Sequence, residues 1–234
     1  MSLPRRTESP RSVAVSAVAV LAVLLTWLTA TGPTAHAVDR AVEVRGGDVI
    51  YSNTGGRCTV GFNTRSGSQT YALLSGRCAQ GSSTWYADAA RTVQIGVTQG
   101  VSFPGNDFAA IRHTNTTVTY PGEVRLGTSG GVRDITGAAQ PSVGQSLCHV
   151  GRVGGYRCGI VQSVNNTVTY PEGVVYGLFR SNICSEPGDP GGPAFSGGTA
   201  LGVIVGGSGN CSTGGTTFYQ PVTEALSTYG LSLY

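Results

Sequence analysis

Short apolar runs separated by glycine or asparagine recur along most of the chain. They are rich in Val, Ile, Tyr and Phe, which favours short strands joined by tight turns over helices. We expect strands at residues 58–62, 70–74, 93–97, 108–112, 158–164, 174–179 and 201–205. Their regular spacing predicts an all-β protein, built as a barrel or a sandwich.

One helical pattern stands out at the C-terminal end. Pro221 can begin the first turn and Gly230 can cap the last one. The apolar residues between them fall on one face of a helix: Val222, Ala225, Leu226 and Tyr229. The chain is therefore expected to end in a packed helix.

The N-terminal residues follow a different pattern. Arginines precede an apolar run over residues 13–28, and Ala35-His36-Ala37 forms an A-x-A cleavage site behind it. The run is slightly long for a signal peptide, so an uncleaved anchor is the alternative. No second hydrophobic span follows. We divide the chain into a signal peptide at 1–37, a short segment at 38–45 and one domain at 46–234.

Composition narrows the possible partners and cofactors. The 36 glycines agree with many tight turns, and 15 basic against 12 acidic residues leave little net charge. A nearly neutral protein is not expected to bind nucleic acid or, once the signal is cleaved, a membrane. No Cys-x-x-Cys or His-x-x-His spacing occurs, so we expect no metal and no cofactor.

Six cysteines form an even set in a chain that is expected to be exported. Oxidising conditions outside the cell let disulfides persist, which predicts a framework of three bridges. The sequence alone allows about 15 pairings, of which bridges between neighbours are the simplest. The cysteines are Cys58, Cys78, Cys148, Cys158, Cys184 and Cys211.

Four separated motifs resemble a known family. They read GGDVIYSNTGGRCTVGFN, NDFAAIRHTNTT, CSEPGDPGGP and GGSGNCSTGGTTFYQPVTEALSTYG. In this order they resemble the streptogrisins, secreted bacterial serine proteases of the chymotrypsin family, over about residues 46–234. The resemblance implies two six-stranded antiparallel β-barrels with a boundary near 120–135 and an active site between them. It also implies the disulfides 58–78, 148–158 and 184–211.

Two residues depart from the catalytic pattern of this family. Hydrolysis by this design needs a hydroxyl nucleophile, an imidazole base, a carboxylate that orients the base, and N–H donors for the oxyanion. By resemblance the carboxylate is retained as Asp107, but Arg77 replaces the histidine and Pro190 replaces the serine. Gly188 is the remaining oxyanion position. Because arginine keeps its proton and proline has no hydroxyl, we expect no useful amidase activity.

A third departure lies beside the same carboxylate. Relatives place a serine at the position of Val205, where its hydroxyl helps to hold the aspartate. Without that serine and the histidine, a buried Asp107 would lack partners. We therefore predict an ion pair between Arg77 and Asp107.

No other residue is expected to rescue catalysis. His113 follows Asp107 on an extended strand and should lie roughly 20 Å further along. We interpret His113 and His149 as surface or strand histidines. Ser185 and Ser196 flank the GDPGGP loop, but neither lies at the sharp turn that presents a nucleophile.

The substrate cleft is expected to remain. Gly206-Gly207-Ser208-Gly209 matches the family's edge segment, which pairs with an extended peptide, and this pairing needs no catalytic triad. The resemblance implies a primary pocket with room for a large apolar side chain. It would be lined by Ser185, Glu186, Pro187, Gly206 and Gly207. The alternative is that these residues persist only because they fold the second barrel.

These observations predict a secreted, monomeric pseudoprotease. It would bind a peptide, a protein segment or a serine-protease inhibitor in the former cleft. One rival is an active serine endopeptidase of the streptogrisin family that cleaves after large apolar residues. Another is a purely structural or cell-surface protein.

Overall fold

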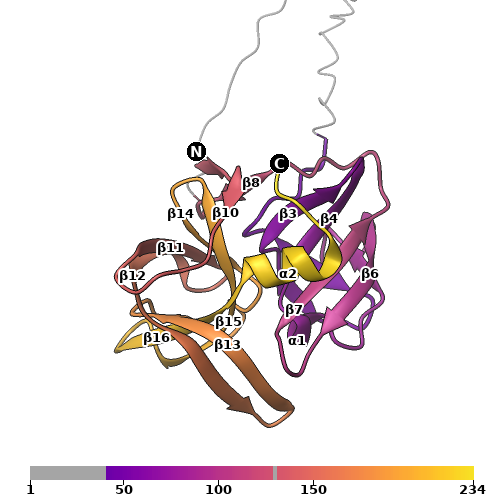
Figure 1. Ribbon diagram of the computed structural model, residues 1–234. Helices are drawn as coiled ribbons and strands as arrows, with labels where there is room; N and C mark the ends of the chain where they lie inside the picture. The colour runs from indigo at the N-terminus through magenta and orange to yellow at the C-terminus, as the bar shows by residue number, and fades with distance from the viewer. Residues whose placement is uncertain (1–40, 129–130) are drawn as a thin grey trace, which may run out of the picture. The chain divides into compact units, whose positions relative to one another are not determined.

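A computed structural model describes residues 41–128 and 131–234 (Figure 1). The predicted signal peptide at 1–37 lies outside the described residues. Within the described ranges, no helix is long and apolar enough to cross a membrane.

The first half of the domain folds into one antiparallel sheet. Its strands lie in the order β2-β1-β5-β6-β7-β4-β3, and β2 and β3 at its two ends are consecutive in the chain. Val60 and Gly61 join these ends: Val60 hydrogen bonds with Gly47 and Asp48, and Gly61 donates to Leu73 O. The sheet is thus barrel-like, and β2 with β3 acts as one bent strand. The strands are β1 Val49–Ser52, β2 Arg57–Thr59, β3 Phe62–Ser66, β4 Gln69–Leu74, β5 Thr84–Tyr86, β6 Gln94–Ser102 and β7 Phe108–His113.

The second half forms a ring of strands. The order is β10-β15-β14-β11-β12-β13-β16, and a further pairing of β15 with β16 closes the ring. The short β10 joins β15 in parallel. Between the two sheets in the chain lies a hairpin of β8 Glu123–Arg125 and β9 Val132–Asp134. The remaining strands are β10 Gly137–Ala138, β11 Ser146–Gly151, β12 Gly155–Tyr170, β13 Gly173–Ser181, β14 Pro193–Ser196, β15 Thr199–Asn210 and β16 Gly214–Pro221.

The described ranges also contain two short helices. The predicted C-terminal helix is confirmed as α2, Val222–Tyr229, and Gly230 ends it in the left-handed conformation with φ 62°. The Gly230 N–H bonds back to Leu226 O and Ser227 O, as a glycine cap does. The sequence analysis did not anticipate α1, Gly76–Ala79, whose first turn is capped by the Ser75 side chain.

Most predicted strands are confirmed, but the segment 58–62 is split. A side chain at Gly61 would lie 2.5 Å from Val203 and 2.8 Å from Leu73 O, so only glycine fits where the chain passes between the two sheets. The segment 93–97 begins one residue before β6. The other predicted segments, 70–74, 108–112, 158–164, 174–179 and 201–205, lie inside β4, β7, β12, β13 and β15.

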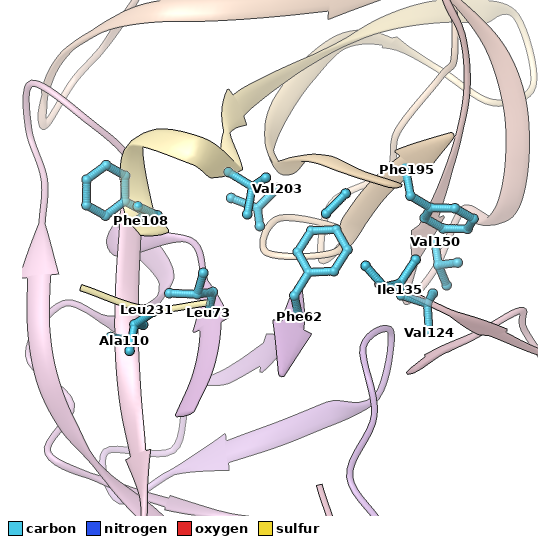
Figure 2. Packing of buried hydrophobic residues seen from close by; sticks show 13 residues of the cluster. Phe62, Leu73, Phe108, Ala110, Val124, Ile135, Val150, Phe195, Val203 and Leu231 are labelled. Atoms are coloured by element: carbon cyan, nitrogen blue, oxygen red, sulfur yellow. The ribbon is translucent and has the colours of Figure 1, made fainter. Parts of the chain in front are cut away.

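A shared apolar core joins the two sheets (Figure 2). Phe62, Leu73 and Phe108 come from the first sheet, and Phe195 and Val203 come from the second. Because burying apolar side chains is favourable, this contact stabilises one arrangement of the two sheets. The residue before β7, Asp107, is thereby held beside the second sheet.

The disulfide pairing implied by the resemblance is confirmed. All six cysteines are bonded to a neighbour in the chain, and none is free. The pairs are Cys58–Cys78, Cys148–Cys158 and Cys184–Cys211. This framework fits an extracellular protein.

Candidate functional site beside Asp107

The carboxylate of Asp107 is buried where β7 begins. Its Oδ1 accepts hydrogen bonds from the Ser75 hydroxyl at 2.8 Å and from the backbone N–H of Arg77 at 2.6 Å. Both donors lie at the start of α1. The Asp107 N–H donates to Gln220 Oε1 at 2.9 Å. These bonds fix the carboxylate between α1 and the second sheet.

One oxygen of this carboxylate is unsatisfied. Within the described part of the chain, Asp107 Oδ2 has no hydrogen-bond partner. Burial raises the pKa of Asp107 above its ordinary value, while the Arg77 N–H, the Ser75 hydroxyl and the Arg77 charge lower it by less. Burial therefore outweighs the donors around this group.

The Arg77 side chain does not form the predicted ion pair. Its Nη2 donates to Val205 O at 3.4 Å, and its guanidinium lies 4.4 Å from the ring centroid of Tyr170. Among the described residues, no salt bridge joins Arg77 to Asp107, so that prediction is wrong. Asp107 is bonded to the backbone of Arg77 instead, while the guanidinium is held by a carbonyl and an aromatic face.

Arg77 and Pro190 border one cavity. Its volume is about 250 Å³, and Pro190 and Gly188 line it together with residues of α1. Asp189 is buried between them and holds the loop, since its carboxylate accepts from the N–H groups of Val153 at 2.7 Å and Glu186 at 2.8 Å. The full lining is Arg57, Ser75, Arg77, Cys78, Glu172, Gly188 and Pro190.

The predicted peptide-binding edge is one side of β15. Residues 206–210 pair with β16 on one side, whereas the pairing of β14 with β15 ends at Val203. In the described ranges no strand pairs with the other side of 206–210. Gly207, Ser208 and Gly209 are exposed.

The predicted primary-pocket residues are partly brought together. A side chain at Gly207 would lie 2.4 Å from Ser185 Oγ, so these two residues are in contact. Glu186 Oε1 accepts from the Cys211 N–H at 2.7 Å, which ties this wall to the disulfide of Cys211. Pro187 is exposed, and Ser196 lies apart in β14.

The two histidines lie in strands, as predicted, but neither is on the surface. His113 Nδ1 is 3.1 Å from Thr70 Oγ1, and its ring stacks on Tyr120 with centroids 3.5 Å apart. His149 Nδ1 is 2.8 Å from the Tyr219 hydroxyl. Burial lowers the pKa of His113 to about 3 and that of His149 to about 4. Neither histidine lines the cavity that Arg77 and Pro190 border.

Four residues around the cavity were not predicted from the sequence: Arg57, Ser75, Tyr170 and Glu172. Tyr170 and Glu172 lie at the hairpin of β12 and β13, and only the three-dimensional fold brings that hairpin to α1. No sequence pattern marked them. In the ranges that the structure describes, no group of three or more His, Cys, Asp or Glu residues could hold a metal ion.

Comparisons with known proteins agree with this architecture. The family model described as "Trypsin" matches residues 64–228. Serine protease 2 of Streptomyces fradiae is 49% identical over 176 residues, covering 74% of this chain and 100% of that protein. Streptogrisin-A of Streptomyces griseus is 46% identical over 191 residues, covering 81% of this chain but 61% of that protein.

A solved structure has the same fold. Alpha-lytic protease homolog N4 superposes with a TM-score of 0.77 at 55% identity, covering 82% of this chain and 100% of that chain. The family match spans more than half of the sequence, and the similarity to serine protease 2 extends over that protein's whole length. The chain therefore belongs to the trypsin family, as a homologue of the streptogrisins and related bacterial serine proteases.

Proposed function

We propose that this chain is a secreted, monomeric protease homologue that binds a peptide or protein segment in its cleft without cleaving it. One observation carries the proposal: Arg77 and Pro190 border the same cavity, beside the buried carboxylate of Asp107. By the family resemblance, these are the positions of the base, the nucleophile and the orienting carboxylate.

Neither residue can perform the chemistry of its position. Pro190 has no hydroxyl to attack a carbonyl and no N–H to stabilise an oxyanion. Arg77 cannot act as the base, because a guanidinium already carries its proton at neutral pH. A serine protease without its triad still accelerates hydrolysis roughly 10³- to 10⁴-fold over the reaction in water, through substrate binding and its oxyanion hole. Here Gly188 alone would supply that hole, so the expected rate is lower still.

The binding surface does not depend on the triad. The free side of residues 206–210 offers main-chain groups to an extended peptide, and Gly207 with Ser185 forms a wall beside it. Proteins of this family bind peptide substrates or inhibitors in such a cleft. A serine-protease inhibitor protein is therefore a second possible ligand of the same surface.

An active endopeptidase is the rival function, favoured by relatives that are named as serine proteases. The double variant Arg77→His with Pro190→Ser tests the assignment of both positions. We expect it to react with a fluorophosphonate at position 190, while the two single variants do not. Failure of a correctly folded double variant to react would contradict the assignment.

A further inference from the structure

Two arginine side chains border the cavity at the end of the free strand edge. Arg57 comes from β2 and Arg77 from α1. Arg77 uses one N–H on Val205 O in a long hydrogen bond of 3.4 Å, and a guanidinium has five N–H groups. Within the described part of the chain, the guanidinium of Arg57 makes no hydrogen bond or ion pair. Most of the donors on both side chains are therefore available to a ligand.

The position of Arg77 fixes which end of a bound peptide it would meet. Its guanidinium bonds Val205 O and lies 3.9 Å from where a Gly206 side chain would begin, at the N-terminal end of the free edge. A peptide that pairs antiparallel to β15 brings its C-terminus to this end, whereas a parallel peptide brings its N-terminal ammonium. Positive charge at this end favours the first arrangement.

We propose that the cavity binds the C-terminal carboxylate of a peptide whose last residues pair with positions 206–210 of β15. The inference rests on the proposed function, since it names the class of ligand for the same cleft. The planar guanidinium of an arginine can donate two parallel N–H···O hydrogen bonds to one carboxylate. The cavity of about 250 Å³ has room for the carboxylate.

A chain terminus fits this site better than an acidic side chain. Side chains of an added strand alternate between the two faces of the sheet. The end of the main chain instead continues along the strand direction, toward Arg77. Terminal carboxylate capture combined with strand addition is a known mode of peptide recognition.

Two acidic residues of the protein oppose an anion here, to different extents. Asp107 is buried, and its Oδ1 already accepts two hydrogen bonds. Glu172 lines the cavity and is exposed, so it competes with a ligand carboxylate for the arginines. Removing the charge of Glu172 should therefore tighten the binding of a free carboxylate.

The test compares two probes that differ in one group. The probes are a short N-acetylated peptide ending in phenylalanine as the free acid, and the same peptide as its C-terminal amide. Binding of each to the purified protein is measured by calorimetry or fluorescence polarisation. We expect the acid to bind roughly 10- to 100-fold more tightly, as one charge-assisted pair allows.

The variants separate charge from fold. Arg77→Gln should remove most of the preference for the acid and leave only the share that Arg57 supplies. Glu172→Gln should strengthen binding of the acid by about threefold without changing that of the amide. Unfolding midpoints of both variants show whether the fold is kept. Glu172 lies on an exposed turn, so Glu172→Gln is expected to fold. Its affinity for the acid therefore tests the site even where Arg77→Gln fails to fold.

Three results would overturn the inference. Equal binding of acid and amide would refute the carboxylate site but leave peptide binding in the cleft intact. Absence of binding by both probes would refute the proposed function together with the inference. An unchanged preference for the acid in folded Arg77→Gln would place the carboxylate elsewhere.

Discussion

Asp107→Asn is expected to stabilise the protein at neutral pH. In an active trypsin-family enzyme the corresponding carboxylate orients the base, so replacing it lowers the catalytic rate. Here the carboxylate is fully buried, and its Oδ2 lacks a partner in the part of the chain that the structure describes. Asparagine keeps the acceptor Oδ1 for Ser75 and for the Arg77 N–H, and it removes the buried charge.

The magnitude follows from three opposing contributions. Desolvating a buried carboxylate costs several kcal/mol, taken here as about 4. Neutralising it weakens the two hydrogen bonds to Oδ1 by about 1 kcal/mol each, and the new amide N–H group lacks a partner at a cost of about 1 kcal/mol. The variant should gain about 1 kcal/mol in free energy of unfolding, or roughly 2–4 °C in Tm.

The gain should depend on pH in a defined direction. The pKa of Asp107 is raised in the folded protein above the ordinary 3.8 of the unfolded chain. The folded state therefore binds the proton more readily, and this group adds stability as pH falls through its folded pKa toward 3.8. The advantage of Asp107→Asn should shrink over that window and vanish below it.

Thermal or guanidinium unfolding from about pH 7 to below pH 4 measures this difference. Asp88→Asn is the matched control, because Asp88 is not buried and accepts from the N–H groups of Val93 and Thr92, which lower its pKa. Removing the Asp88 carboxylate should destabilise the folded protein at neutral pH. The difference in free energy of unfolding from the native chain should vanish in acid. A folded Asp107→Asn that is less stable than the native chain at pH 7 would refute the reasoning.

Three further predictions concern the stability of the fold. Replacing Cys184 and Cys211 by serine opens a loop with a sequence separation of 27 and should cost about 3–4 kcal/mol in denaturant unfolding. His149, with its pKa lowered to about 4, should make the folded protein lose roughly 3 kcal/mol as pH falls from 6.5 to about 4, and His149→Gln should flatten that loss. Gly230→Ala should cost about 1 kcal/mol, because Gly230 ends α2 with φ 62°, and the unfolding midpoint measures it.

The sequence predicted the architecture more completely than the site. Five predicted strands lie inside observed strands, and the helix after Pro221 ends at Gly230 as expected. These features depend on local apolar patterns and on turn chemistry. The missed strands, such as β14 with Pro193 at its start, are short and depend on pairing with distant segments.

Side-chain geometry was the part that sequence could not supply. The prediction of an Arg77–Asp107 ion pair was wrong because the backbone N–H of Arg77 is bonded to Asp107, leaving the guanidinium to contact Tyr170. Tyr170 comes from a hairpin far along the chain, so no spacing rule connects it to α1. The burial of His113 and His149 likewise depends on packing rather than on their strand positions.

The central claim is that the cavity bordered by Arg77 and Pro190 lacks a working nucleophile. The most direct measurement is the reaction of the purified native protein with a fluorophosphonate, together with cleavage of a peptide that carries Leu, Phe or Tyr before the scissile bond. The account predicts no labelling and no turnover, because Pro190 has no hydroxyl and Arg77 cannot accept a proton. Labelling at a mapped serine, with peptide cleavage, would contradict it and show an active endopeptidase.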